Sequence, residues 1–112
     1  MNYTIRGKVV RGDGYGRKIG CPTVNLETNI KEFPLVGVYA GKALLDGIQY
    51  KAGIVIGPGD KVEAHLIGYA GDAYGKRVTL QIKKFIREYK KFDTEEELTA
   101  QIKKDIEICS QE

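Results

Sequence analysis

Residues 36–56 read VGVYAGKALLDGIQYKAGIVI, two largely apolar stretches on either side of Asp46-Gly47. An Asp-Gly pair is among the strongest sequence signals for the two-residue turn that closes a tight β-hairpin. The pattern therefore predicts two antiparallel strands, residues 36–45 and 48–56, joined at that turn.

Four further segments on either side of this hairpin are predicted to be extended, because apolar and polar residues alternate in them or proline disfavours a helix. These segments are residues 3–10, 22–26, 62–67 and 76–87. In the last of them, Val78, Leu80 and Ile82 are expected to share one face, as a period of two requires.

The final segment changes to a helical period. Thr94 and Glu97 fit a capping box, in which the threonine hydroxyl and the glutamate satisfy the first free backbone amides of a helix. The apolar residues that follow recur at helical spacing and are expected to form one stripe: Leu98, Ile102, Ile106 and Cys109. We therefore expect a helix over about residues 94–109.

The predicted strands all precede this helix, and no helix is predicted between them. That order disfavours a parallel sheet and favours an antiparallel barrel with the helix packed on its outside. We predict a mainly β fold, a six-stranded antiparallel barrel of the Greek-key type over about residues 2–92 with one C-terminal α-helix. The 112 residues are expected to form a single domain.

Composition disfavours several classes of protein. The apolar runs are far shorter than the roughly 20 residues of a membrane-spanning helix, and the start MNYTIR lacks the features of a signal peptide, so a cytoplasmic protein is expected. Two cysteines, Cys21 and Cys109, make no disulfide framework. A net charge of +3 is too small to favour nucleic-acid binding.

Residues 11–20, RGDGYGRKIG, form a glycine-rich loop that also carries Arg11, Arg17 and Lys18. Glycines let backbone amides approach an anion closely, so the loop could hold phosphates. It matches neither a P-loop nor a dinucleotide fingerprint, and a simple turn between strands is the alternative.

Thr23 and Asn25 follow on one face of an extended segment. Their oxygens suit Mg²⁺ bound to substrate phosphates, or they are ordinary turn residues.

Glu63 and His65 are expected on one face of the strand at 62–67, opposite its apolar residues. Glu63 is either a general base for a hydroxyl nucleophile or a solvated carboxylate. The single histidine makes a zinc site improbable on spacing. The segment REYKKF, residues 87–92, mixes cations with aromatic rings and is either a site for a flat phosphorylated ligand or a basic linker.

Taken in order, several blocks resemble the riboflavin kinase family. They are GKVVRG at 7–12, GRKIGCPTVN at 16–25, GVYA at 37–40, Ile56-Gly57, VEAH at 62–65, DAYG at 72–75, IREYKKF at 86–92 and the terminal helix. Ordered blocks at compatible spacing are far more specific than one motif. The resemblance implies a stand-alone kinase domain that transfers the γ-phosphate of ATP to the ribityl 5′-hydroxyl of riboflavin, giving FMN.

The family's residue roles fall on particular positions of this sequence. The resemblance implies Glu63 as the catalytic carboxylate and Thr23 and Asn25 as ligands of Mg²⁺, or of another divalent ion such as Zn²⁺ or Mn²⁺. The implied nucleotide contacts are Gly12, Arg17, Leu66 and Tyr74. The implied contacts to the flavin and the FMN phosphate are Arg87, Lys90 and Phe92.

The implied partners are riboflavin and FMN, and ATP and ADP, bound by a monomer that has no nucleic-acid or membrane partner. The sequence departs from the family at Val24, where alanine is usual, at Cys21, and in a shorter loop before Glu63. Two alternatives remain at this point: a non-catalytic flavin- or nucleotide-binding regulatory module with the same barrel, and a barrel that binds single-stranded nucleic acid. The nucleotide donor, ATP or CTP, is open.

Overall fold

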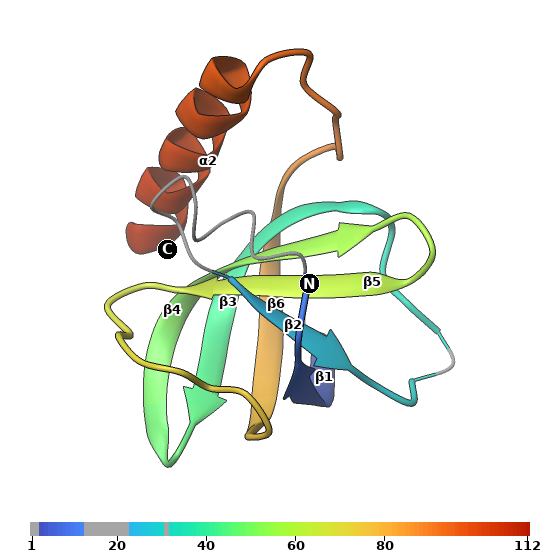
Figure 1. Cartoon of the computed structure of the whole chain (residues 1–112), viewed down its shortest axis with the longest axis vertical. Coiled ribbons are helices and arrows are strands. Elements are labelled where there is room, and N and C mark those ends of the chain that lie inside the picture. The colour runs from blue at the N-terminus through green and yellow to red at the C-terminus, as the bar shows by residue number, and fades with distance from the viewer. Residues whose placement is uncertain (1–2, 13–22, 31) are drawn as a thin grey trace.

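The computed structural model describes residues 3–12, 23–30 and 32–112 (Figure 1). Within these residues the chain forms six strands and one helix, close to the predicted bounds. They are β1 (Tyr3–Val10), β2 (Val24–Glu27), β3 (Gly37–Leu45), β4 (Ile48–Gly57), β5 (Lys61–Leu66), β6 (Arg77–Arg87) and α2 (Glu95–Ser110).

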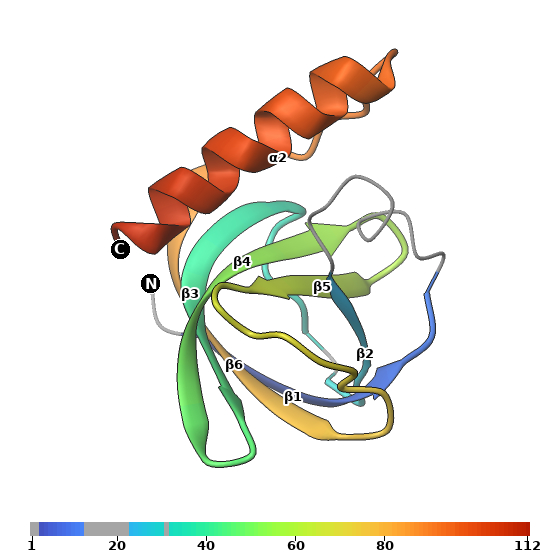
Figure 2. The same ribbon diagram turned by 60° about the vertical axis from the view of Figure 1, so that its left-hand side comes forward.

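The strands close into a barrel in the order β1-β2-β5-β4-β3-β6, and every neighbouring pair is antiparallel. Strands β3, β4 and β5 follow one another, and β6 returns to lie beside β3, which is a Greek-key arrangement. The helix lies outside the barrel (Figures 1 and 2). The predicted six-stranded antiparallel barrel with one outer helix is confirmed.

The barrel interior is apolar because alternate residues of each strand point inward. The predicted face of β6 is buried, with Val78, Leu80 and Ile82 at most 1% exposed. Tyr39 and Ile54 are also fully buried in the same cluster. Burying an aliphatic or aromatic side chain of this size stabilises the fold by about 1.5–3 kcal/mol, so this cluster provides the main driving force for closing the barrel.

The hairpin turn is formed as the sequence predicts. Asp46 and Gly47 have φ values of 52° and 77°, and Leu45 pairs with Ile48 on either side of them. Positive φ at both central residues is the geometry that matches the right-handed twist of two antiparallel strands. The turn therefore fixes the register of β3 against β4.

The helix begins at its predicted cap, since the Thr94 hydroxyl accepts a hydrogen bond of 3.1 Å from the Glu97 backbone amide. The predicted apolar stripe of the helix is only partly buried. Only Cys109 of the stripe is buried, together with Asp105, whereas the other stripe residues remain half-exposed.

In residues 3–12, 23–30 and 32–112, no helix has both the length and the apolar character needed to cross a membrane.

A substitution at Gly41 tests the close packing of β3 against β6. A Cβ atom at this position would lie 2.0 Å from the Gln81 carbonyl oxygen, where the register of the two strands shifts. Gly41→Ala should lower the free energy of unfolding by about 1–3 kcal/mol, as overpacking does, measured by urea denaturation. Gly53→Ala is the matched control, because its Cβ would meet only the Cys109 sulfur at 3.5 Å. Equal stability of the two variants would contradict the prediction.

Candidate active site

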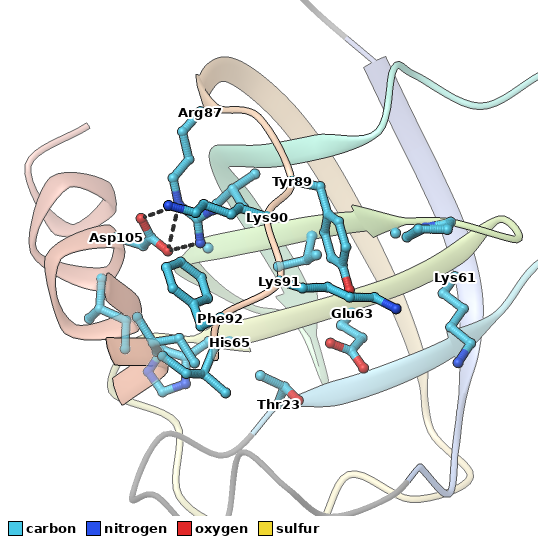
Figure 3. Close-up of a pocket in the computed structure, with 18 residues that line it drawn as sticks. Thr23, Lys61, Glu63, His65, Arg87, Tyr89, Lys90, Lys91, Phe92 and Asp105 are labelled. Carbon is cyan, nitrogen blue, oxygen red and sulfur yellow. Dashed lines mark hydrogen bonds and ion pairs between the residues drawn. The ribbon is translucent and has the colours of Figure 1, made fainter. Parts of the chain in front are cut away.

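Two cavities of similar size lie side by side and share one residue, Thr23. The first, which we call the helix cavity, measures about 470 Å³ and lies between β4, β5, the segment 87–92 and α2. The second, the loop cavity, measures about 480 Å³ and lies between the end of β1, β2 and the segment 69–74. The side chains in the helix cavity are drawn in Figure 3.

Strand β5 contributes Glu63 and His65 to the helix cavity. Val62, Ala64 and Leu66 point into the barrel and are at most 4% exposed, whereas Glu63 and His65 are half-buried on the outer face. The predicted alternation of this strand is confirmed. Figure 3 shows Glu63 near Thr23 at the floor of the cavity, where a carboxylate would meet a ligand that reaches the shared boundary.

Strand β2 places Asn25 beside Glu63. The two residues are direct antiparallel partners in the β2–β5 ladder, so their side chains leave the sheet on the same face. Asn25 lines the loop cavity, and its amide lies against Gly12, where a Cβ atom would be 2.0 Å from Nδ2. Only glycine leaves the Asn25 amide in this position, and the chain just after β1 thus approaches β2 closely.

The predicted nucleotide contacts that the structure describes gather at the loop cavity: Gly12, Leu66 and Tyr74 all line it. The Tyr74 backbone amide donates a 2.9 Å hydrogen bond to Asp72 Oδ1, which fixes the local turn. Arg17 lies outside the described residues. Arg11, which the resemblance did not assign, lies with Cζ 4.4 Å from the centre of the Tyr74 ring.

The three predicted flavin contacts, Arg87, Lys90 and Phe92, all line the helix cavity. Both cations lie near the Phe92 ring: Arg87 Cζ is 5.7 Å and Lys90 Nζ 5.5 Å from its centre. These distances are within reach of cation–π attraction. Their assignment to a flavin remains a prediction.

Asp105 is a site residue that sequence reasoning did not identify. It is 7% exposed, and its carboxylate accepts hydrogen bonds from Arg87 Nε at 3.0 Å and from Arg87 Nη2 at 2.8 Å. Gln101 Nε2 donates a further bond to this carboxylate at 3.0 Å. The sequence carried a signal, because the helical period places Asp105 on the same side as Ile102 and Cys109, where a charge requires a partner.

The described residues contain no group of three or more His, Cys, Asp or Glu side chains that could hold a metal ion. Thr23 and Asn25 offer one hydroxyl and one amide oxygen, hard ligands that suit Mg²⁺ when phosphate oxygens complete its shell.

Burial raises the pKa of the Cys109 thiol to about 11. That thiol stays protonated at neutral pH and is not a candidate nucleophile.

The riboflavin kinase family model, Flavokinase, matches residues 1–112. The chain belongs to the riboflavin kinase family. The family resemblance seen in the sequence is therefore confirmed over the whole chain.

Curated relatives of this family member are larger proteins. The bifunctional riboflavin kinase/FMN adenylyltransferase of Escherichia coli K12 is 36% identical over 111 residues, which cover 92% of this chain and 36% of that protein. The protein of the same name from Bacillus subtilis 168 is 36% identical over 114 residues, again 92% of this chain and 36% of the relative. The chain thus spans about a third of the length of these relatives.

Two solved structures share the barrel of this riboflavin kinase family member. A crystal structure named as a macrolide-efflux protein from Streptococcus pneumoniae superposes with a TM-score of 0.90 at 31% identity, covering 97% of this chain and 38% of that one. The riboflavin kinase of Trypanosoma brucei gives a TM-score of 0.73 at 22% identity, covering 98% and 76%. The second likeness supports the fold.

A substitution at Gly12 tests the contact of the chain after β1 with Asn25 of β2 at the loop cavity. Gly12→Ala must displace the Asn25 amide, so we expect Mg²⁺-ADP binding to weaken about tenfold, or 1.4 kcal/mol, in calorimetric titration. Gly57→Ala is the control, since its Cβ would meet nothing closer than 3.7 Å. Unchanged nucleotide affinity in Gly12→Ala would remove the Asn25 amide from the nucleotide site.

Proposed function

We propose that this protein is a riboflavin kinase that transfers the γ-phosphate of ATP to the 5′-hydroxyl of riboflavin. The observation that carries the proposal is that the two cavities meet at Thr23, beside Glu63. A kinase needs two substrates held end to end, with the reacting oxygen and phosphorus at their junction. The implied flavin contacts line one cavity and the described nucleotide contacts line the other, which supports this arrangement.

The helix cavity suits a flat, mainly apolar ring with a polar tail. Its outer wall consists of half-exposed aliphatic side chains of α2, with Phe92 next to them. Its floor carries Glu63, so a ligand that places its ring under the helix can extend a hydroxyl chain toward that carboxylate. Arg87, Lys90 and Phe92 are proposed as the flavin-side residues.

The loop cavity suits the nucleotide. Tyr74 is 48% exposed and has Arg11 over its ring, and Leu66 provides apolar surface. Gly12 allows the backbone to approach phosphates closely. Arg17 is proposed with them, on the strength of the family resemblance alone.

Glu63 is proposed as the general base. The riboflavin 5′-oxygen attacks the γ-phosphorus, the bond from that phosphorus to the β,γ-bridging oxygen breaks, and Glu63 accepts the hydroxyl proton, so that FMN and ADP result. Thr23 and Asn25 are proposed to hold Mg²⁺, with Zn²⁺ or Mn²⁺ as alternatives. Such an ion, when bound with the nucleotide, neutralises charge on the transferring phosphoryl group.

We further propose that the enzyme acts in the cytoplasm as a monomer on free small molecules, without nucleic-acid or membrane partners. The modest net charge of +3 supports the part of this proposal that concerns nucleic acid. The direct test of activity is incubation with riboflavin, Mg²⁺ and each nucleoside triphosphate in turn, followed by chromatography. FMN should form with ATP. Absence of FMN with every donor would contradict the proposed function and favour a binding module.

Glu63→Gln keeps the shape of the side chain but cannot accept the proton. We expect kcat to fall about 10²-fold or more, the usual contribution of a general base, while riboflavin affinity and thermal stability stay close to wild type. Stopped-flow or steady-state FMN formation measures the effect. Turnover near that of wild type would remove Glu63 from the mechanism.

Thr23→Ala removes one hydroxyl at the boundary of the two cavities. The Mg²⁺ and ATP concentrations needed for half-maximal activity should rise about tenfold, because one oxygen ligand is lost, while flavin binding without nucleotide stays nearly intact. Activity is titrated with Mg²⁺ at fixed ATP, and flavin binding is followed by fluorescence. Collapse of flavin binding with unchanged metal dependence would contradict the assignment.

A further inference from the structure

Helix α2 is attached to the barrel by few buried side chains. Of its 16 residues, only Asp105 and Cys109 are buried, and both belong to its C-terminal half. Figure 2 shows these last turns beside β3 and β4, while the first turns extend beyond the barrel. The apolar residues Leu98, Ile102 and Ile106 face the helix cavity and do not pack tightly on the barrel.

An apolar helix face held over an open cavity requires a device that fixes its distance from the barrel. Hydrophobic contact alone would favour closing the gap, because half-exposed aliphatic side chains gain free energy on burial. Among the ion pairs of the described residues, the most buried is the one that joins the end of β6 to the helix, Arg87 with Asp105, whose side chains are 22% and 10% exposed.

The geometry of this pair is two-pronged. Arg87 Nε and Nη2 both donate to the Asp105 carboxylate, and Gln101 on the same helix donates to it as well. The planar guanidinium fork makes such a pair directional, so it fixes orientation as well as distance. Figure 3 shows the bonds between Arg87 and Asp105 at the edge of the helix cavity.

Arg87 also fixes the chain that leaves β6. Its Nη1 donates a 3.0 Å hydrogen bond to the Glu88 carbonyl, and its guanidinium lies 5.7 Å from the Phe92 ring centre. All three guanidinium nitrogens therefore donate within the protein. One side chain thus connects the segment 87–92, where the chain leaves β6, with the helix, and both line the cavity.

We propose that Arg87 and Asp105 are positioning residues that hold α2 and the segment 87–92 at the separation that a flavin ring requires. This inference rests on the proposed function, because it assigns the helix cavity to the flavin. Arg87 then serves flavin binding through Asp105, and it is not chiefly a ligand of the FMN phosphate. Loss of either partner should affect riboflavin and FMN alike.

A double-mutant cycle tests the proposal with Arg87→Ala, Asp105→Ala and the double variant. Riboflavin and FMN affinities are measured from flavin fluorescence, and KM values from FMN formation. Each single change should weaken both flavins by about tenfold or more, since small misplacements in a site have large effects. KM for ATP should change little, and the double variant should be no weaker than the single ones, because the two residues act as a unit.

Cys109→Ala is the matched control. Cys109 lies one turn further along the buried side of the same helix, outside the cavity lining, so it reports weakened docking of the helix without loss of the pair. Its flavin affinity should stay within about twofold of wild type. Arg87→Lys, which keeps the charge but not the fork, should restore part of the affinity. If the alanine variants do not fold, Arg87→Lys and Asp105→Asn replace them in the same double-mutant cycle.

Two results would overturn the proposal. The first is a selective loss of FMN binding in Arg87→Ala with normal binding of both flavins in Asp105→Ala, which would make Arg87 a direct phosphate ligand. The second is an equal loss of flavin affinity in Cys109→Ala, which would make the pair merely structural. A wild type that binds flavins but forms no FMN would overturn the kinase activity while the affinity cycle still decides the role of the pair.

Discussion

The pairing of the short strand β2 with β5 is the constraint on which the site depends. This ladder places Asn25 opposite Glu63 and Val24 opposite Ala64, and it helps to close the barrel. A slip of one residue in β5 would turn Glu63 into the apolar interior, because side chains alternate between the two faces. A buried unpaired carboxylate is costly, so the hydrophobic core itself keeps Glu63 on the outer face.

The molecule separates stability from chemistry. Alternate residues of the strands fill an apolar interior, and among the described residues no buried side-chain nitrogen or oxygen lacks a hydrogen-bond partner. The polar groups of the site lie on the outer face of the barrel, under α2 and beside the loop after β5. Substitutions of the outer-face residues of the site can therefore change ligand binding without opening the core, except at Asp105, whose buried charge depends on Arg87. Leu66, which lines the loop cavity, belongs to the core itself.

Most of the fold was predictable because its signals are local: alternation along strands, the Asp46-Gly47 turn and the Thr94 cap each involve a few neighbouring residues. The outward direction of Glu63 was predictable for the same reason. Its pairing with Asn25 was not, since strand register between distant segments leaves no local pattern. The helical period revealed an apolar stripe but not that the stripe faces a cavity, and nothing near Asp105 in sequence indicated Arg87 as its partner.

The central claim is that two substrates occupy two cavities that meet at Thr23 beside Glu63. A crystal structure with riboflavin, Mg²⁺ and a non-hydrolysable ATP analogue tests it most directly. We predict the flavin ring under α2, the nucleotide beside Tyr74, and the 5′-hydroxyl within about 3.2 Å of the Glu63 carboxylate, as a general base requires. Both ligands in one cavity, or a 5′-hydroxyl directed away from Glu63, would contradict the account.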